Sequence, residues 1–166
     1  MKHLLIILSI LLLSSPVIGN NHKGETLYRW EGPKKTEKTT LGFFIIKSTY
    51  VWKGFGDKET HPKYTGDVKN GEPNGLGYLI FPDGDKYVGS WKNGKRNGKG
   101  THTYSYGRKY VGSWKDGWKN GQGKVSWTSG GYYEGSFKDG TFWTGTTYDK
   151  DGNIVYKLVN NMMINQ

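Results

Sequence analysis

The sequence predicts an all-β protein, an antiparallel meander of stacked β-hairpins, from a 23-residue repeat and from the turn residues within each copy. Copies start at Tyr64, Tyr87, Tyr110 and Tyr133, and each continues with a glycine at position 3, a lysine at position 6 and Asn-Gly or Asp-Gly at positions 7 and 8. Self-similarity at a fixed period indicates one supersecondary unit stacked several times. Stacked units form a long surface, which favours a binding function.

The first half of each copy predicts a strand with one aromatic face. Positions 1, 3 and 5 are tyrosine, glycine and an aromatic residue or valine. Alternate residues of a strand share a face, so we expect these three positions to point the same way. The predicted structural core of the repeats is Tyr64, Gly66, Tyr87, Gly89, Trp91, Tyr110, Gly112, Trp114, Tyr133, Gly135 and Phe137.

The second half of each copy predicts a tight turn and a returning strand. Asn-Gly and Asp-Gly suit the positive φ angles of a two-residue hairpin turn. The return strand alternates again, as in Gly98, Gly100, His102 and Tyr104, and the glycine pair recurs at Gly75/Gly77 and Gly121/Gly123. We expect these glycines on the aromatic face, each under a ring of a neighbouring strand. Burial of one ring removes roughly 150–250 Å² from water, which at about 25 cal/mol per Å² stabilises a thin sheet without helices.

The pattern Tyr-x-Gly-x-(Trp/Phe)-x-(Asn/Asp)-Gly-x-x-x-Gly-x-Gly over residues 64–140 resembles the MORN family (membrane occupation and recognition nexus). The resemblance implies a non-enzymatic interaction module that binds proteins or membranes. The fourth copy departs from the pattern, because its second strand keeps one glycine, Gly145, and starts one residue earlier relative to the turn. We interpret it as a terminal cap, which repeat arrays usually need.

The ends of the chain differ from the repeats. Lys2 and His3 precede the apolar run Leu4–Leu13, and Ser-Ser-Pro follows, which is the layout of a cleavable secretory signal peptide. The run is shorter than the ~20 residues that span a bilayer, although an uncleaved anchor stays an alternative. We therefore expect a periplasmic or extracellular protein, with a bacterial envelope favoured. The predicted divisions are a signal peptide (1–19), a β-rich cap with loops (20–63), four repeats (64–86, 87–109, 110–132 and 133–152) and a C-terminal strand or tail (153–166).

Segments outside the repeats give weaker predictions. Apolar and aromatic runs indicate strands, and polar runs with proline or glycine indicate loops. We expect the segment before the repeats to pair with the first edge of the meander, since an open apolar edge invites aggregation. Predicted strands are Thr26–Trp30, Leu41–Ile46, Thr49–Trp52 and Ile154–Val159, and predicted loops are Gly32–Thr40 and Gly54–Lys63.

Charge gives the strongest indication of a partner. The net charge is +10, and residues 86–124 contain Asp116 as their single acid. Position 6 is lysine in every copy, which places lysines roughly 10 Å apart along one rim of the sheet, where they would attract anions. The alternative is that these lysines keep the sheet soluble. Candidate residues that bind an anion or partner are Lys69, Lys92, Lys95, Arg96, Lys99, Lys115, Lys119 and Lys138.

The sequence favours no catalytic, cofactor or metal site. It has no cysteine, so thiol chemistry and thiolate ligation are excluded. Ser90, Ser113 and Ser136 recur at position 4, but no histidine recurs with them as the base that a nucleophile needs. His102 occupies a position that is aliphatic in other copies, so we expect a packed side chain there.

Three hypotheses follow. The first is an exported interaction module that binds a protein partner or an anionic membrane surface. The second is a glycan-binding module of the cell wall that uses exposed aromatic rings, of which Trp118 is the best candidate because position 9 lies off the repeated aromatic face. The third is a structural protein that self-associates as a homodimer. Nucleic acid is disfavoured as a partner, because an exported protein rarely meets it.

Overall fold

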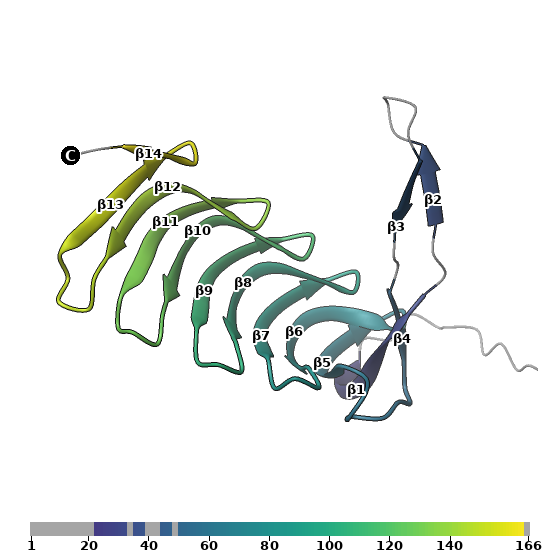
Figure 1. Cartoon of the computed structure of the whole chain (residues 1–166). Helices are drawn as coiled ribbons and strands as arrows, with labels where there is room; N and C mark the ends of the chain where they lie inside the picture. Colours follow the sequence, from purple (N-terminus) through teal and green to yellow (C-terminus); the bar gives the residue numbers. More distant parts are fainter. Residues whose placement is uncertain (1–21, 33–34, 39–43, 48–49, 165–166) are drawn as a thin grey trace, which may run out of the picture.

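The computed structural model describes residues 22–32, 35–38, 44–47 and 50–164 (Figure 1). The described part is all-β, and it consists of one open 12-stranded antiparallel sheet and a separate two-stranded sheet. It contains no helix with the length and hydropathy that a membrane span requires. The predicted fold class is therefore confirmed. The signal peptide predicted for residues 1–19 lies outside the described residues and stays a prediction.

The repeats form the centre of the large sheet as consecutive hairpins. From the second strand of the first repeat onward, each repeat strand pairs with the strand before it and the strand after it, as the meander predicts, and the first repeat strand pairs with the N-terminal cap. The hairpins are β5 (Lys63–Lys69) with β6 (Glu72–Ile80), β7 (Lys86–Lys92) with β8 (Lys95–Thr103), β9 (Lys109–Lys115) with β10 (Trp118–Ser126), and β11 (Tyr132–Lys138) with β12 (Thr141–Tyr148). Figure 1 shows these strands as curved arcs that follow one another along the sheet.

The hairpin tips have the predicted turn geometry. Asn93 and Gly94 have φ angles of 48° and 72°, and Asp116 and Gly117 have 50° and 91°. Both residues of such a turn need positive φ, which Asn, Asp and Gly adopt at low cost. The turn glycine also links neighbouring hairpins, because the Gly94 N–H donates to the Pro73 carbonyl oxygen at 3.0 Å. The same bond joins Gly117 to Arg96 and Gly140 to Lys119.

The segment before the repeats covers the first edge of the meander, as predicted. The predicted strand Thr26–Trp30 lies within β1 (His22–Glu31), which covers the first edge of the meander by pairing with β5. β4 (Tyr50–Lys53) pairs with the other side of β1 and forms the end of the sheet.

Two predictions between these strands are wrong. We expected a loop over Gly32–Thr40, but Lys35–Lys38 is β2. We expected Leu41–Ile46 to join the meander edge, but Phe44–Lys47 is β3 and pairs with β2 in the separate sheet. The reason is topological, since β1 already occupies the edge of β5, and β2 and β3 pair with each other. Residues 39–43, which include Leu41, lie outside the described residues.

The C-terminal end extends further than predicted. β13 (Ile154–Val159) confirms the predicted last strand, and β14 (Met162–Ile164) follows it through a turn at Asn160 and Asn161. Both asparagines have positive φ, 52° and 65°. The fourth repeat is therefore not the end of the sheet. A fifth hairpin tip follows it, in which Asn-Asn stands where the four repeats have Asn-Gly or Asp-Gly. Asparagine tolerates this conformation better than most residues.

The core is a continuous stack of rings on one face, which we call the aromatic face. Tyr87 is fully buried, and its ring lies across Gly89 and Gly100 of its own hairpin. Its hydroxyl donates to the Ser90 carbonyl oxygen at 3.0 Å, a bond that Tyr64, Tyr110 and Tyr133 repeat. Trp91 meets the Tyr87 ring edge-on at a centroid distance of 5.2 Å. Edge-to-face contacts between rings stabilise beyond simple burial.

The glycines of position 12 are not under a ring, contrary to our expectation. Gly75, Gly98 and Gly121 have φ angles of 119°, 98° and 85° and lie where the register between the two strands of a hairpin shifts. A glycine with positive φ at such a shift is typical of a β-bulge. The rings instead cover the glycines of positions 3 and 14.

Candidate functional site

A row of lysines runs along the hairpin tips on the side of the sheet opposite to the rings, which we call the basic face. Lys69, Lys92, Lys115 and Lys138 are the last residues of β5, β7, β9 and β11, and all are exposed. Each of these lysines is at position 6 of its repeat, whereas the buried tyrosine and the glycine are at positions 1 and 3. Because alternate residues of a strand point to opposite faces, the lysines lie on the face away from the rings. We call this row the tip ladder.

A second row of lysines lies on the same face, at the ends of the strands that are farthest from the hairpin tips. Lys63, Lys86 and Lys109 are the first residues of β5, β7 and β9, six residues before the tip ladder. Six is an even number, so both rows point to the same side of the sheet. At about 3.3 Å per residue the rows are roughly 20 Å apart. We call this second row the inner ladder.

Sequence reasoning missed the inner ladder, although a signal was present. A lysine directly precedes the repeat tyrosine in three of the four copies, at the same 23-residue period as the tip ladder. Applying the alternation rule to that position would have placed it opposite the rings.

The other predicted basic residues divide between the two faces. Lys95 lies across from Lys92 on the basic face, and Lys99 lies across from Ser113 and donates to its Oγ at 3.0 Å. Arg96 and Lys119, however, lie across from Trp91 and Trp114 and therefore share the aromatic face. They do not belong to a single basic rim with the tip ladder.

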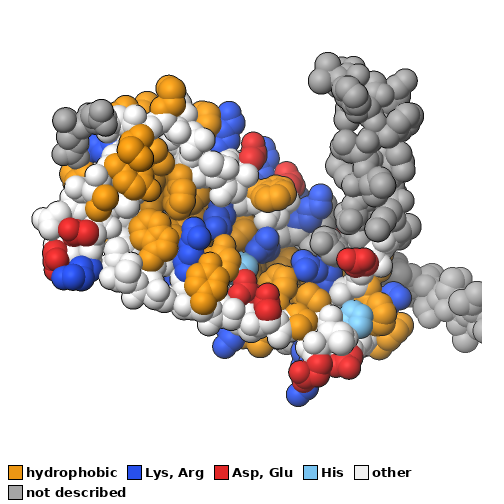
Figure 2. All heavy atoms as spheres, viewed as in Figure 1, with side chains coloured by type: hydrophobic (Ala, Val, Ile, Leu, Met, Phe, Trp, Pro, Cys, Tyr) orange, Lys and Arg blue, Asp and Glu red, His pale blue; other side chains and the backbone are white. Residues whose placement is uncertain are grey.

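Arg96 and Lys119 pack on rings. The Arg96 guanidinium carbon lies 4.2 Å from the centroid of the Trp114 ring, and Lys119 Nζ lies 5.2 Å from that of Tyr110. Such cation–π contacts hold both cations over the core. Figure 2 shows hydrophobic side chains interspersed with Lys and Arg over the central strands.

The ladders are little neutralised. Among the described residues, no ladder lysine has a carboxylate oxygen within 4.0 Å of its Nζ atom. The ion pair on this face joins Lys124, which belongs to neither ladder, to Glu134 at 3.8 Å. Acids in the repeat strands of the basic face are Asp67, Glu72 and Glu134. Like charges at this spacing repel weakly but produce an additive positive potential.

A shallow hollow of about 520 Å³ lies on the basic face between the two ladders. Its floor is the backbone of Gly89, Gly100, Gly112 and Gly123. Its walls are Val88, Thr101, Val111, Lys99, Gln122, Lys124 and Glu134.

Trp118 is the most exposed tryptophan of the described chain, with 62% of its surface accessible. It lies across from Lys115, next to the tip ladder. Trp91 and Trp114 are buried in the stack, and Trp143 lies beneath Lys138, whose Nζ is 4.4 Å from the ring centroid. Among these rings, Trp118 is the one that a partner can reach.

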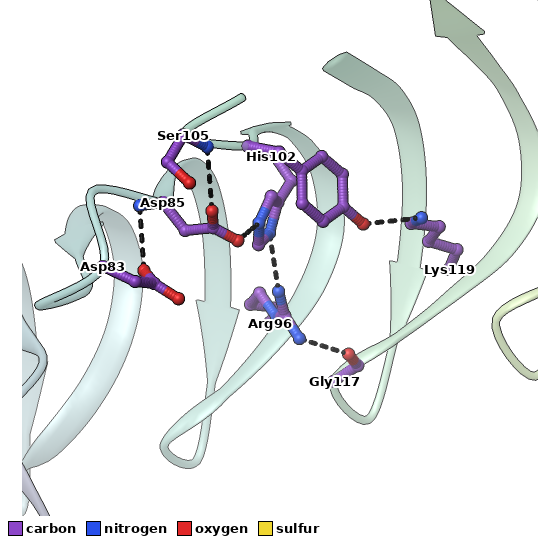
Figure 3. Close-up of polar contacts among 8 residues, drawn as sticks. Asp83, Asp85, Arg96, His102, Ser105, Gly117 and Lys119 are labelled. Carbon is purple, nitrogen blue, oxygen red and sulfur yellow. Dashed lines mark hydrogen bonds and ion pairs between the residues drawn. The ribbon is translucent and has the colours of Figure 1, made fainter. Parts of the chain in front are cut away.

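A polar network crosses the aromatic face at the centre of the sheet (Figure 3). His102 Nε2 lies 2.9 Å from Asp85 Oδ2, and His102 Nδ1 lies 3.0 Å from Arg96 Nη1. Arg96 also donates to the Gly117 carbonyl oxygen at 2.9 Å, so the network joins three successive repeats. Because arginine can only donate, Nδ1 must accept and Nε2–H must donate to Asp85, which requires a neutral His102.

The environment favours this neutral state. His102 is 6% exposed, and burial lowers the pKa of His102 below its ordinary value. The positive charge of Arg96 also lowers the pKa of His102, whereas the hydrogen bond that His102 donates to Asp85 raises it. Burial also lowers the pKa of the Arg96 guanidinium to about 10.

We expect this network to make the free energy of unfolding depend on pH. The His102 pKa is about 6.5 in the unfolded chain and lower in the folded protein. As the pH falls below 6.5, the unfolded state therefore binds more protons than the folded state. The free energy of unfolding decreases as the pH is lowered, until the pH is below the pKa of the folded protein. His102→Leu, which copies Leu79 of the first repeat, should flatten this dependence between pH 5 and 7.5 in urea titrations. His61→Leu is the matched control, and an equally pH-dependent His102→Leu would contradict the assignment.

The described residues contain no group of three or more His, Asp or Glu side chains that could hold a metal ion. The geometry offers a long surface with one charged face and one filled, aromatic face. Groups on the charged face that a partner can contact include the lysines and the exposed ring of Trp118.

An open, single-layer sheet of tandem hairpins with one charged face defines a β-repeat binding module. The family model of the MORN repeat matches residues 64–86, 87–105 and 110–132. Residues 64–132 therefore contain three MORN repeats. MORN repeats are generally non-enzymatic modules that bind proteins or membrane lipids. A search of curated proteins found no match to this chain.

Proposed function

We propose that this chain is a non-enzymatic binding module that docks on an anionic membrane surface through its basic face. The observation that carries the proposal is the pair of parallel lysine ladders on one side of the sheet. Both follow the 23-residue period, and neither is paired with acids among the described residues. Regularly spaced lysines without acidic partners match a binding partner whose negative charge is spread over a wide surface.

A membrane surface matches this distribution better than a compact protein patch. The ladders are roughly 20 Å apart and extend over successive hairpins about 10 Å apart, so the charge covers a wide plane. A lysine close to an anionic bilayer contributes about 1 kcal/mol, and the contributions add. Trp118 supports the same orientation, since tryptophan favours the membrane interface.

The test is co-sedimentation of the purified protein with anionic and neutral vesicles at low and high salt. We expect binding to anionic vesicles, weakened at high salt because the Debye length shortens. Lys86→Glu/Lys109→Glu, in the inner ladder, should bind at least about 30-fold more weakly, from about 1 kcal/mol per lysine removed. Lys92→Glu/Lys115→Glu, in the tip ladder, should do the same.

A control with equal charge change lies off the basic face. Lys58→Glu/Lys150→Glu reverses two exposed lysines that already have acidic neighbours, Glu59 and Asp151. This variant should keep most of the binding. If ladder and control variants bind alike, or if the unmodified protein ignores anionic vesicles at low salt, the proposal is wrong.

The exposure of Trp118 also favours a second candidate, the binding of a cell-wall glycan. A solvent-facing ring can stack on a sugar, and Trp118 is 62% exposed. Titration with cell-wall fragments should change the tryptophan fluorescence of the unmodified protein and leave that of Trp118→Phe unchanged. No change in either protein would exclude this candidate.

A further inference from the structure

One position of the polar network changes from an acid to a cation in the next repeat. Asp85 directly precedes β7, and Arg108 directly precedes β9 at the same position of the following repeat. Asp85 is held by His102, whose Nε2 lies 2.9 Å from Asp85 Oδ2. The residue that corresponds to His102 in the following repeat is Val125, which has no acceptor in its side chain. The contact that holds Asp85 therefore has no equivalent at Arg108.

Arg108 lacks a hydrogen-bond partner for one of its donors. Its Nε atom is buried and makes no hydrogen bond within the described part of the chain. The guanidinium carbon lies 5.5 Å from the centroid of the Tyr104 ring, and the residue as a whole is partly exposed. A guanidinium can only donate, and its strongest hydrogen bonds go to anions. Arg108 is therefore a cation that an anionic ligand can reach.

A second cation contacts the same ring. Lys119 corresponds to Arg96 of the network, and its Nζ lies 5.4 Å from the centroid of the Tyr104 ring. It donates to the Tyr104 hydroxyl at 3.0 Å (Figure 3). Among the described residues, neither Arg108 nor Lys119 has a carboxylate oxygen within 4.0 Å. The network has an acid at one end and a cation at the other, whereas the next repeat has two cations, which attract an anion.

Partly exposed rings continue this site along the sheet. Position 18 is aromatic in the first three repeats, and these rings lie in the turns between hairpins, at Phe81, Tyr104 and Trp127. Successive rings are roughly 10 Å apart, since each repeat adds two strands. Tyr106 lies in the same turn as Tyr104, at a centroid distance of 5.4 Å, and 63% of its surface is accessible. Such rings offer flat apolar surfaces on which sugars can stack.

We propose that Arg108 and Lys119 bind the charged group of an anionic sugar, whose ring stacks on Tyr106. The two cations suit a carboxylate, a sulfate or a phosphate alike, so the ligand class is a sugar that carries any of these groups. An acidic protein segment would also satisfy both cations, but it would leave the accessible Tyr106 ring without a contact. The site is on the aromatic face, away from both lysine ladders and from Trp118, so it does not depend on membrane docking.

The experiment titrates the full-length protein with trisaccharides of galacturonic acid, of sulfated galactose and of neutral galactose, and measures Kd by calorimetry. We expect the charged trisaccharides to bind and the neutral one to bind at least about tenfold more weakly. Arg108→Gln and Lys119→Gln should each weaken binding about tenfold, and Tyr106→Ala should weaken it about threefold. Lys58→Gln is the matched control, because it removes the same charge from an exposed lysine in the loop after β4.

Equal binding of the charged and neutral trisaccharides, or equal effects of Arg108→Gln and Lys58→Gln, would overturn the inference. A glutamate tripeptide that binds as tightly as the charged sugars, with no effect of Tyr106→Ala, would overturn the sugar class and indicate an acidic protein partner. The charged trisaccharide that binds more tightly identifies the charged group. Vesicle binding is measured separately, so loss of sugar binding leaves membrane docking intact, and failure of vesicle binding leaves the sugar site intact.

Discussion

Tyr110→Ala should lower the free energy of unfolding by about 3–5 kcal/mol, the range for removing a large buried ring. Tyr110 is fully buried near the middle of the sheet. Its ring meets Trp114 at a centroid distance of 5.2 Å and Phe137 at 4.9 Å, both edge-on. The substitution breaks the aromatic stack between two repeats and leaves a cavity that the surrounding strands can only partly fill.

The lost hydroxyl adds to this effect. The Tyr110 hydroxyl donates to the Ser113 carbonyl oxygen at 2.8 Å. Tyr110→Phe removes this bond and keeps the ring, so it should cost about 1 kcal/mol. The difference between the two variants measures what the ring contributes by packing.

Tyr106→Ala is the control for Tyr110→Ala. Tyr106 lies in the turn between β8 and β9 and is 63% exposed, so its removal should change stability by less than about 0.5 kcal/mol. Chemical denaturation followed by circular dichroism compares the variants. Similar stabilities of Tyr106→Ala and Tyr110→Ala would contradict the stacked core described above.

Gly100→Ala should destabilise the protein by about 2–3 kcal/mol, at the upper end of overpacking effects. A Cβ atom at Gly100 would lie 2.6 Å from two ring carbons of Tyr87 and closer still to its hydroxyl oxygen. The ring cannot withdraw, because it is fully buried and its hydroxyl is bonded to Ser90. The strand or the ring must shift, and either movement disturbs the stack.

Gly54→Ala tests whether the steric contact is the cause. A Cβ at Gly54 would have no heavy atom within 4 Å, and its φ is not positive. We therefore expect Gly54→Ala to be nearly neutral in the same denaturation assay. The double variant Gly100→Ala/Tyr87→Ala should show strong non-additivity, because removing the ring removes the clash. If the losses of stability in the two single variants simply add in the double variant, the effect of Gly100→Ala does not come from a clash with the Tyr87 ring.

Much of the basic face could be predicted from position within the repeat. The tip ladder follows from lysine at position 6, and the same rule extends to Lys63, Lys86 and Lys109, which were overlooked. Arg96 was assigned to the rim, although position 10 is in phase with the glycine and aromatic positions of the return strand. The structure places it over Trp114. The side of the sheet on which Arg96 lies follows from its position in the strand and not from its charge.

Other features had no local signal. Nothing in Lys35–Lys38 and Phe44–Lys47 alone indicates that these two strands form a sheet of their own, because that outcome depends on β1 occupying the edge of β5. The network joins His102 and Arg96 of β8 to Asp85, which lies in the turn before β7, and its end at the Gly117 carbonyl depends on how tightly neighbouring hairpins approach.

The residues alone are enough to predict the repeat, the strand and turn positions within it, and the side of the sheet on which most side chains lie. These properties are local: φ preferences at Asn-Gly and the two-residue period of a strand act within one hairpin. Contacts in the folded sheet set which strands form its ends, which cations pack over rings, and where the basic face is hollowed. These properties depend on contacts between residues far apart in the chain. The 23-residue repeat predicts the structure within one hairpin and does not predict such contacts.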